Sequence, residues 1–312
     1  MGELRKDYIL DRWVLYSAGR GARPKEFKPE PVHTVQEGPC FFCPGNERLT
    51  PPEIGRIGTK QWRVRWFANK FPALEPEGTA VPRTNNRFFT VANNYGFHEV
   101  IVETPLHAKQ LADMNLREIA DVLGVYQNRI AELGKKPNIR YVNVIKNHGY
   151  HAGTSIVHTH SQVFATAIVP PAVRDKIAAI RRFLRCPYCD IVAAEKAGER
   201  HCFENKDFVA FCPYASRYNY EVWIFPKRHI RTLAQANLDL LADILKRVLV
   251  RVSALNVSYN LFVTYAPSDE DLHFHIEVMP QIAIWGGLER GSRVVINSVM
   301  PEVAAKFYRG EE

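Results

Sequence analysis

One order of metal-binding residue types occurs twice in this chain of 312 residues. Each half opens with a Cys-x-x-Cys, at Cys40–Cys43 and at Cys186–Cys189. An apolar run then ends on a histidine, over 98–107 in the first half and 220–229 in the second, and a His-x-His follows later. Chance does not readily match so many positions in one order, so we infer a duplicated unit.

Regular secondary structure is expected at corresponding places in both halves. Helical spacing of apolar residues extends over 108–133 and over 233–255, and a β-rich stretch follows each, at 139–145 and 258–265. The alternation of strands and helices predicts an α+β fold with antiparallel sheets and packed helices. Because a helix cannot continue through Pro170-Pro171, we expect one domain over 1–170 and a second over 171–312.

The repeat selects the candidate metal ligands. His107 aligns with His229, whereas His98 aligns with Tyr220 and is therefore not expected to be a ligand. Two sets of two cysteines and two histidines result, a pattern typical of structural zinc: Cys40, Cys43, His107 and His158 in one, and Cys186, Cys189, His229 and His273 in the other. Cys202 and Cys212 are expected to be buried apolar residues, and a disulfide between them stays open.

Composition limits the classes of protein and partner. With 46% hydrophobic and 24% charged residues, the chain has ordinary globular usage. It has no apolar stretch near the roughly 20 residues that span a bilayer and no apolar segment at its start. We therefore expect a cytoplasmic protein that does not bind membranes. The net charge of +8 favours anionic partners, and the dispersed cations favour small anionic substrates over nucleic acid.

The segment 147–164 is the richest in chemically active residues. Its second half alternates like a strand, so His158, His160 and Gln162 should share a face. Its first half includes Gly149, and Gly153, Thr154 and Ser155 form a loop whose amides and hydroxyls could surround a phosphate. An imidazole held at His160 could attack phosphorus, and Gln162 could donate a hydrogen bond to a non-bridging oxygen.

This run resembles the active-site motif of the galactose-1-phosphate uridylyltransferases, in the histidine triad superfamily, whose core reads His-Pro-His-Gly-Gln. Further elements of the family are matched along nearly the whole chain. They are the N-terminal element 13–24, the nucleotide-side loop 67–72, and the C-terminal His273-Phe-His275 with Glu289. The resemblance implies two histidine-triad-like halves, with the catalytic motif and one metal site in the first half and the second metal site in the second.

The resemblance implies a two-step exchange. A histidine takes UMP from UDP-glucose, and galactose 1-phosphate then collects it, so the implied enzyme is a UDP-glucose–hexose-1-phosphate uridylyltransferase. Carried over by position, His160 is the nucleophile and Gln162 the phosphoryl partner. The implied substrate contacts are Asn147 and Ser155 at the phosphates, Arg20 and Arg23 at anionic groups, Asn69 near ribose and base, and Glu289 near the hexose. The family also implies a homodimer with sugar contacts from the second subunit. The two ligand sets predict two zinc ions, of which the second resembles that of the plant ADP-glucose phosphorylase branch.

The chain departs from the family pattern in three places. The central motif reads His-Thr-His-Ser-Gln, and Ser161 in place of Gly occurs in relatives that act on adenylyl sugars. Lys176 stands where bacterial members place an acidic iron ligand, and the second Cys-x-x-Cys resembles the plant ADP-glucose phosphorylases. Val295 stands where the sugar transferases place a Gln.

Three hypotheses follow. The first is uridylyl transfer between UDP-glucose and galactose 1-phosphate. The second is an ADP-sugar or diadenosine polyphosphate phosphorylase that uses the same histidine with phosphate as acceptor. The third is a zinc-stabilised nucleotide- or RNA-binding module without catalysis, against which the complete set of loop, His-x-His and Gln argues.

Overall fold

The computed structural model describes residues 2–22 and 38–311, which form two compact units. We name each unit by the strand that begins at the second histidine of its His-x-His. The β9 unit comprises residues 38–146 and 156–171, and the β14 unit comprises residues 2–22, 147–155 and 172–311. Each unit is therefore assembled from segments that are separated in the sequence.

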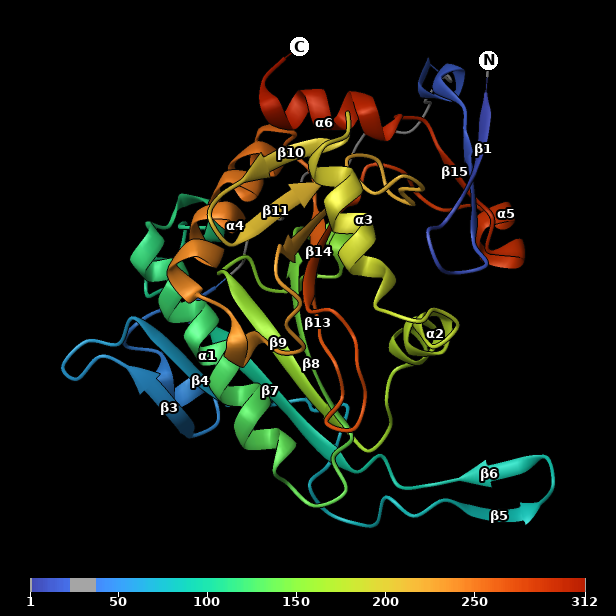
Figure 1. Cartoon of the computed structure of the whole chain (residues 1–312). Helices are drawn as coiled ribbons and strands as arrows, with labels where there is room; N and C mark the ends of the chain where they lie inside the picture. The colour runs from blue at the N-terminus through green and yellow to red at the C-terminus, as the bar shows by residue number, and fades with distance from the viewer. Residues whose placement is uncertain (1, 23–37, 312) are drawn as a thin grey trace. The chain divides into compact units, whose positions relative to one another are not determined.

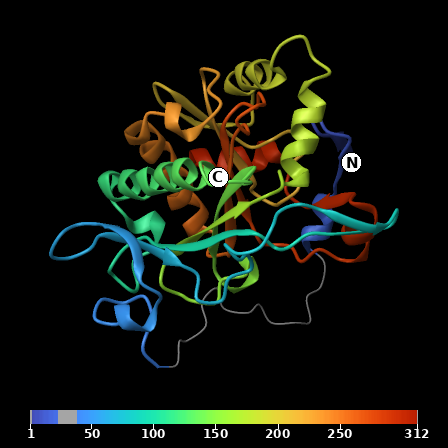
Figure 2. The ribbon, with the colours of Figure 1, turned by 90° about the horizontal axis from the view of Figure 1, so that it is seen from below.

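The β9 unit has an antiparallel sheet with the strand order β3-β4-β7-β9-β8 (Figure 1). Its strands are β3 (Glu53–Ile57), β4 (Val64–Ala68), β7 (Gly96–Val102), β8 (Tyr141–His148) and β9 (His160–Thr166). Two short elements are added, the 3-10 helix η2 (Glu47–Leu49) and the hairpin of β5 (Arg83–Asn86) and β6 (Phe89–Val91). Figure 2 shows this hairpin as an arm that extends beyond the sheet of its unit.

Helix α1 (Leu116–Gly134) packs on β9 through an apolar face that includes Ile119, Leu123 and Tyr126. It begins later than the apolar spacing predicts, because Asn115 caps it. The Asn115 side chain accepts a hydrogen bond from the Glu118 amide at 3.0 Å, and the Glu118 carboxylate accepts one from the Asn115 amide at 2.8 Å. The preceding apolar residues form the 3-10 turn η3 (Leu111–Asp113) instead.

The β14 unit repeats this arrangement. Its antiparallel sheet has the order β10-β11-β12-β14-β13, in which each strand takes the place of its counterpart in the β9 unit. The strands are β10 (His201–Glu204), β11 (Phe208–Phe211), β12 (Val222–Pro226), β13 (Tyr259–Thr264) and β14 (His275–Pro280). Here too a 3-10 turn, η5 (Leu233–Gln235), precedes the long helix α4 (Leu238–Ala254). The predicted duplicated α+β fold is therefore confirmed.

Additional elements complete the β14 unit. A small sheet has the order β1-β2-β15, from β1 (Glu3–Lys6), β2 (Trp13–Tyr16) and β15 (Val295–Asn297). The other helices are α2 (Pro171–Ile180), α3 (Pro187–Lys196), α5 (Gly287–Ser292) and α6 (Pro301–Arg309), with the 3-10 turns η1 (Ala18–Ala22) and η4 (Tyr150–Ala152). No helix among the described residues combines the length and apolar character that a bilayer requires.

The core of the β14 unit contains the two cysteines that lie outside the Cys-x-x-Cys pairs. Cys202 on β10 and Cys212 just after β11 are both buried, and their Sγ atoms lie 3.6 Å apart as free thiols. Their burial among the sheet and helix side chains agrees with the expected apolar role.

Candidate active site and metal centres

The first predicted ligand set comes together in the β9 unit. Cys40 and Cys43 lie in the turn before β3, His107 follows β7, and His158 lies two residues before β9. Their four ligand atoms all lie within 4.8 Å of one another. The Nδ1 atom of His158 is 3.6 Å from the Sγ atoms of both cysteines, and Nδ1 of His107 is 3.4 Å from Sγ of Cys43.

These distances fit a tetrahedral zinc ion. Bonds of about 2.3 Å to sulfur and about 2.0 Å to nitrogen place adjacent sulfur and nitrogen ligands roughly 3.6 Å apart at the tetrahedral angle. The outer nitrogen of His158 is also satisfied, since Nε2–H donates to the Thr104 carbonyl at 2.7 Å. Such a bond fixes the tautomer that presents Nδ1 to a metal.

The second predicted set comes together in the β14 unit, again within 4.8 Å. Cys189 Sγ lies 3.5 Å from Nδ1 of His229 and 3.9 Å from Nδ1 of His273. The outer nitrogens donate to Asp271 Oδ1 at 2.9 Å and to the Pro226 carbonyl at 3.1 Å. Together with Cys186, this set therefore repeats the ligand types of the first, and His273 repeats the hydrogen bond of His158 to a backbone carbonyl.

Lys176 is not part of the second set. Its side chain is buried on α2, and its ammonium contacts the carboxylate of Glu277 and lies 2.8 Å from Nε2 of His275. The predicted departure from an acidic ligand at this position thus corresponds to a buried Lys176–Glu277 ion pair.

The imidazole of His160 is held by one nitrogen at the start of β9. Its Nδ1 lies 2.9 Å from the carbonyl oxygen of His158, to which Nδ1–H donates. The edge of the Phe42 ring packs against it at a centroid distance of 5.2 Å. Among the described residues, none forms a hydrogen bond with Nε2 of His160, so this nitrogen keeps a lone pair for other use. Burial lowers the pKa of His160 to about 4, which keeps the ring neutral near pH 7.

Gln162 lies two residues further along β9 and therefore projects to the same side as His160. Its Oε1 is 2.9 Å from Nε2 of His98 on β7. Sequence analysis excluded His98 as a metal ligand, and the structure places it beside Gln162 instead. Its connection to Gln162 arises because β7 and β9 are neighbouring strands, with Val100 paired to Gln162.

The opposite side of β9 carries a buried polar network that sequence analysis missed. Ser161 Oγ lies 2.5 Å from both the Glu103 carboxylate and the Tyr126 hydroxyl. Lys146 Nζ and Thr159 Oγ1 each donate to the other Glu103 oxygen at 2.6 Å. Burial by itself raises the pKa of Glu103, but the charge and hydrogen bond of Lys146 outweigh it and lower the pKa.

This network explains the Ser-for-Gly substitution in the central motif. Ser161 has no exposed surface, and its hydroxyl is directed at protein groups in the core. Its direct effect is therefore on the strand that carries His160. No signal in the isolated sequence indicates this, because Glu103, Tyr126 and Lys146 come from three other elements.

The predicted phosphate loop lies in the β14 unit as residues 147–155. The Thr154 hydroxyl donates to the Asn147 carbonyl at 2.5 Å, and Asn147 Oδ1 accepts a hydrogen bond from Asn260 at 2.8 Å. Gly153 has φ of +88°, a conformation that disfavours other residue types. Ser155 is exposed. The loop is thus held by hydrogen bonds within itself and to Asn260, and its last residue, Ser155, is exposed to solvent.

The remaining predicted contacts are distributed over both units. Asn69 follows β4 in the β9 unit, where its Oδ1 accepts a hydrogen bond from the Phe71 amide at 2.9 Å. Arg20 is exposed in η1, and Arg23 lies outside the described residues. Glu289 lies in α5, where its carboxylate accepts a hydrogen bond from the Gly286 amide at 2.9 Å.

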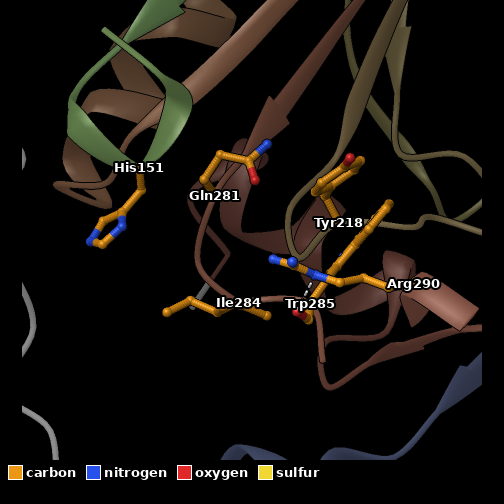
Figure 3. Close-up of a pocket in the computed structure, with 7 residues that line it drawn as sticks. His151, Tyr218, Gln281, Ile284, Trp285 and Arg290 are labelled. Carbon is orange, nitrogen blue, oxygen red and sulfur yellow. Dashed lines mark hydrogen bonds between the residues drawn. The ribbon is translucent and has the colours of Figure 1, made fainter. Parts of the chain in front are cut away.

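A pocket of about 450 Å³ lies in the β14 unit (Figure 3). Tyr218 and Trp285 stack at a centroid distance of 5.0 Å and an interplanar angle of 20°, and Arg290 donates to the Trp285 carbonyl at 3.1 Å. Polar groups of His151 and Gln281 complete the lining, with Ala283 and Ile284. Aromatic faces beside amide and guanidinium groups suit a polyhydroxylated ligand. Of these residues only His151 lies in the segment 147–164 that the sequence singled out.

Comparison with known proteins agrees with the motif. Residues 2–170 match the family model for the galactose-1-phosphate uridyl transferase N-terminal domain. An ADP-glucose phosphorylase from Arabidopsis thaliana is 33% identical over 98% of this chain and 92% of its own length. A galactose-1-phosphate uridylyltransferase from Thermotoga maritima is 29% identical over 100% of this chain and 99% of its own length.

Solved structures show the same relationship. The crystal structure of an ADP-glucose phosphorylase from Arabidopsis thaliana with bound ADP-glucose superposes with a TM-score of 0.85 at 31% identity, over 99% of both chains. A uridylyltransferase structure superposes with a TM-score of 0.77 at 26% identity, over 99% of this chain and 98% of its own. With more than half of the chain matched by the family model, the chain belongs to the galactose-1-phosphate uridylyltransferase family.

Proposed function

We propose that this chain transfers a nucleotidyl group from a nucleotide sugar through a covalent intermediate on His160. The observation that carries the proposal is the state of that imidazole. It is buried and neutral, its Nδ1–H is bonded to the His158 carbonyl, and its Nε2 lone pair has no partner among the described residues. A ring held in this tautomer is a nucleophile at Nε2.

The reaction divides into two displacements at one phosphorus atom. Nε2 of His160 attacks the α-phosphorus, a nitrogen–phosphorus bond forms, and the bond to the bridging oxygen breaks to release the sugar 1-phosphate. An oxygen of the acceptor phosphate then attacks the same phosphorus, and Nε2 departs with its electron pair. The ring gains positive charge in the intermediate while Nδ1–H stays bonded to the His158 carbonyl, whose dipole stabilises that charge.

Other predicted residues have supporting roles in this proposal. The Gln162 amide donates to a non-bridging oxygen. Asn147, Gly153, Thr154 and Ser155 contact the phosphates, Arg20 and Arg23 hold anionic groups, and Asn69 contacts the nucleoside. We assign the hexose to Glu289 and the aromatic pocket of Figure 3, where sugar C–H groups can pack on Trp285.

We propose zinc for both Cys₂His₂ sets. Cys40, Cys43, His107 and His158 would hold one ion, and Cys186, Cys189, His229 and His273 the other. A fully ligated zinc ion supplies structural cross-linking and has no open position for substrate. In the first set it would fix His158, whose carbonyl positions His160. The homodimer, the cytoplasmic location and a domain boundary after residue 170 likewise stay predictions.

Two substrate pairs are candidates. The first is UDP-glucose with galactose 1-phosphate, which the family resemblance supports. The second is ADP-glucose with phosphate, which the greater similarity to ADP-glucose phosphorylase supports, at 33% against 29% identity and TM-scores of 0.85 against 0.77.

The test is incubation of the zinc-loaded protein with UDP-glucose or ADP-glucose in the absence of acceptor, followed by intact mass measurement. We expect a nucleotidyl adduct from one donor. Discharge of a uridylyl adduct by galactose 1-phosphate supports the first pair, and discharge of an adenylyl adduct by phosphate supports the second. A protein that forms no adduct with either donor contradicts the proposed chemistry.

A further inference from the structure

His98 makes a set of contacts that connect it to Gln162 and Asn69. It lies on β7, is 7% exposed, and pairs with Phe164 in the register of β7 and β9. The two rings stack at a centroid distance of 3.9 Å and an interplanar angle of 22°. The plane of the imidazole is therefore fixed, and its two nitrogens have fixed directions.

The hydrogen bonds of His98 determine its tautomer. The backbone amide of Ala73 donates to Nδ1 at 3.1 Å, so Nδ1 must carry a lone pair. Burial lowers the pKa of His98 even though the bond to Gln162 opposes this, and the ring is neutral. The single proton of the neutral ring is therefore on Nε2, which donates to Gln162 Oε1 at 2.9 Å.

Asn69 does not compete for that proton. Its Oδ1 accepts the Phe71 amide, so its NH₂ group is the end that lies 3.1 Å from Nε2 of His98. Two donors face each other in that contact. Gln162 is consequently the acceptor for Nε2–H, and its carbonyl oxygen is committed to His98.

We propose that His98 is a positioning residue that sets the amide orientation of Gln162, so that the NH₂ end is available to a phosphoryl oxygen of the nucleotide donor. This inference rests on the proposed function. A flipped amide would present an oxygen lone pair to an anionic phosphoryl group and repel it, whereas the observed orientation presents a donor. In the described part of the chain, the Gln162 NH₂ group has no hydrogen-bond partner.

The second copy of the motif supports this assignment. Trp223 pairs with Glu277 as Val100 pairs with Gln162, so Glu221 and Glu277 stand at the positions of His98 and Gln162, one residue from the Tyr220 of the sequence alignment. Glu277 contacts Lys176 and His275. The His–Gln pair is thus present in the copy that contains His160, whose Nε2 has no hydrogen-bond partner among the described residues, and is absent from the other copy. A purely structural pair would have no reason to follow the nucleophile.

The test is a double-mutant cycle between His98 and Gln162, measured as the rate of nucleotidyl-adduct formation on His160. His98→Phe keeps an aromatic ring to stack on Phe164 and removes both hydrogen bonds. We expect it to slow adduct formation by roughly 10- to 100-fold, as for the loss of one oriented donor. In a Gln162→Ala background the same change should alter the rate less than about twofold, because its target is gone. His98→Gln, which retains an N–H donor, should recover part of the rate.

A second readout separates orientation from general damage. A nucleotide sugar with an α-phosphorothioate has two diastereomers, which place sulfur at different non-bridging positions of the α-phosphorus. A Gln162 amide in a fixed orientation meets sulfur in one and oxygen in the other, so the two should react at different rates. We expect His98→Phe and Gln162→Ala to reduce the ratio of their rates to the same value. His201→Phe makes the same change at a half-buried histidine on β10 of the other unit and should leave rate and ratio unchanged.

Three results would overturn the inference. One is an unchanged rate in His98→Phe while the parent protein reacts normally. Another is an equal loss in the parent and Gln162→Ala backgrounds, accompanied by a lower melting temperature or zinc content, which marks a structural role. A parent protein that forms no adduct removes the proposed function as well, and this outcome is distinguishable because it does not involve the variants.

Discussion

His160 and His275 occupy equivalent positions on β9 and β14, and each ring is held by the carbonyl oxygen two residues before it. The Nδ1–O distances are 2.9 Å to His158 and 2.8 Å to His273. The hydrogen bonding of the other ring nitrogen differs. Nε2 of His160 has no hydrogen-bond partner in the described part of the chain, whereas Nε2 of His275 contacts Lys176 at 2.8 Å and Glu277 at 3.2 Å. The first copy therefore keeps Nε2 available for reaction, whereas in the second copy Nε2 forms contacts within the core.

The Lys176–Glu277 pair should be important for the stability of the β14 unit. Both side chains are about nine-tenths buried, so Lys176→Met leaves an unpaired carboxylate in the core. We expect a loss of about 3–5 kcal/mol in the free energy of unfolding, measured by urea denaturation. Changing both residues to Met should restore much of the loss. As a control, Lys135→Met breaks the exposed pair with Glu132 and should change stability by less than about 0.5 kcal/mol. Similar losses in Lys176→Met and Lys135→Met would refute the argument.

The two ligand sets should each bind one zinc ion. Cys43→Ser and Cys189→Ser should each reduce the bound zinc by one equivalent in elemental analysis, and chelation should lower the melting temperature because binding is coupled to folding. Cys212→Ala changes a buried cysteine outside both sets and should retain all the zinc. A full zinc content in either serine variant would contradict that ligand assignment.

Much of this metal chemistry could be predicted from the sequence. Cys-x-x-Cys and His-x-His are local patterns whose spacing already fixes geometry, and the repeat distinguished His107 from His98. Glu103, Lys146 and Tyr126 could not be found in this way, because they meet only when β7, β8 and α1 pack around β9. The same holds for His98 and Gln162, which are neighbours through strand pairing. Local capping by Asn115 likewise determined where α1 begins, although the apolar periodicity starts earlier.

Acid should weaken the contact of α6 with the rest of the β14 unit. Burial by itself raises the pKa of Glu302, but hydrogen bonds from Arg5 at 2.8 Å and Arg200 at 2.9 Å lower it below 4.5. A lowered pKa contributes stability that is present above the unfolded value and is lost as pH falls through the folded value. The stability difference between the parent protein and Glu302→Gln should therefore be largest near neutral pH and shrink below pH 4.5. If urea denaturation gave the same stability difference between the parent protein and Glu302→Gln at every pH, this prediction would be refuted.

The loop at 147–155 should depend on the backbone of Gly153. An added Cβ there meets only Asn147 Nδ2 at 3.7 Å, an ordinary contact, so the cost of Gly153→Ala arises from φ of +88°. We expect a loss of about 1 kcal/mol in stability and slower adduct formation, because the loop is proposed to contact the phosphates. An added Cβ at Gly134, at the end of α1, meets nothing within 4 Å, and this residue has no such φ, so Gly134→Ala should cost nothing. Equal stability of the two variants would contradict the conformational argument.

The central claim is that His160 alone carries the nucleotidyl group. The most direct measurement is peptide mapping of the protein after reaction with UDP-glucose or ADP-glucose without acceptor, together with the adduct stoichiometry by intact mass. The account predicts one nucleotidyl group per chain, on His160, absent in His160→Asn and never on His275. A modified His275, or an adduct that persists in His160→Asn, would contradict it.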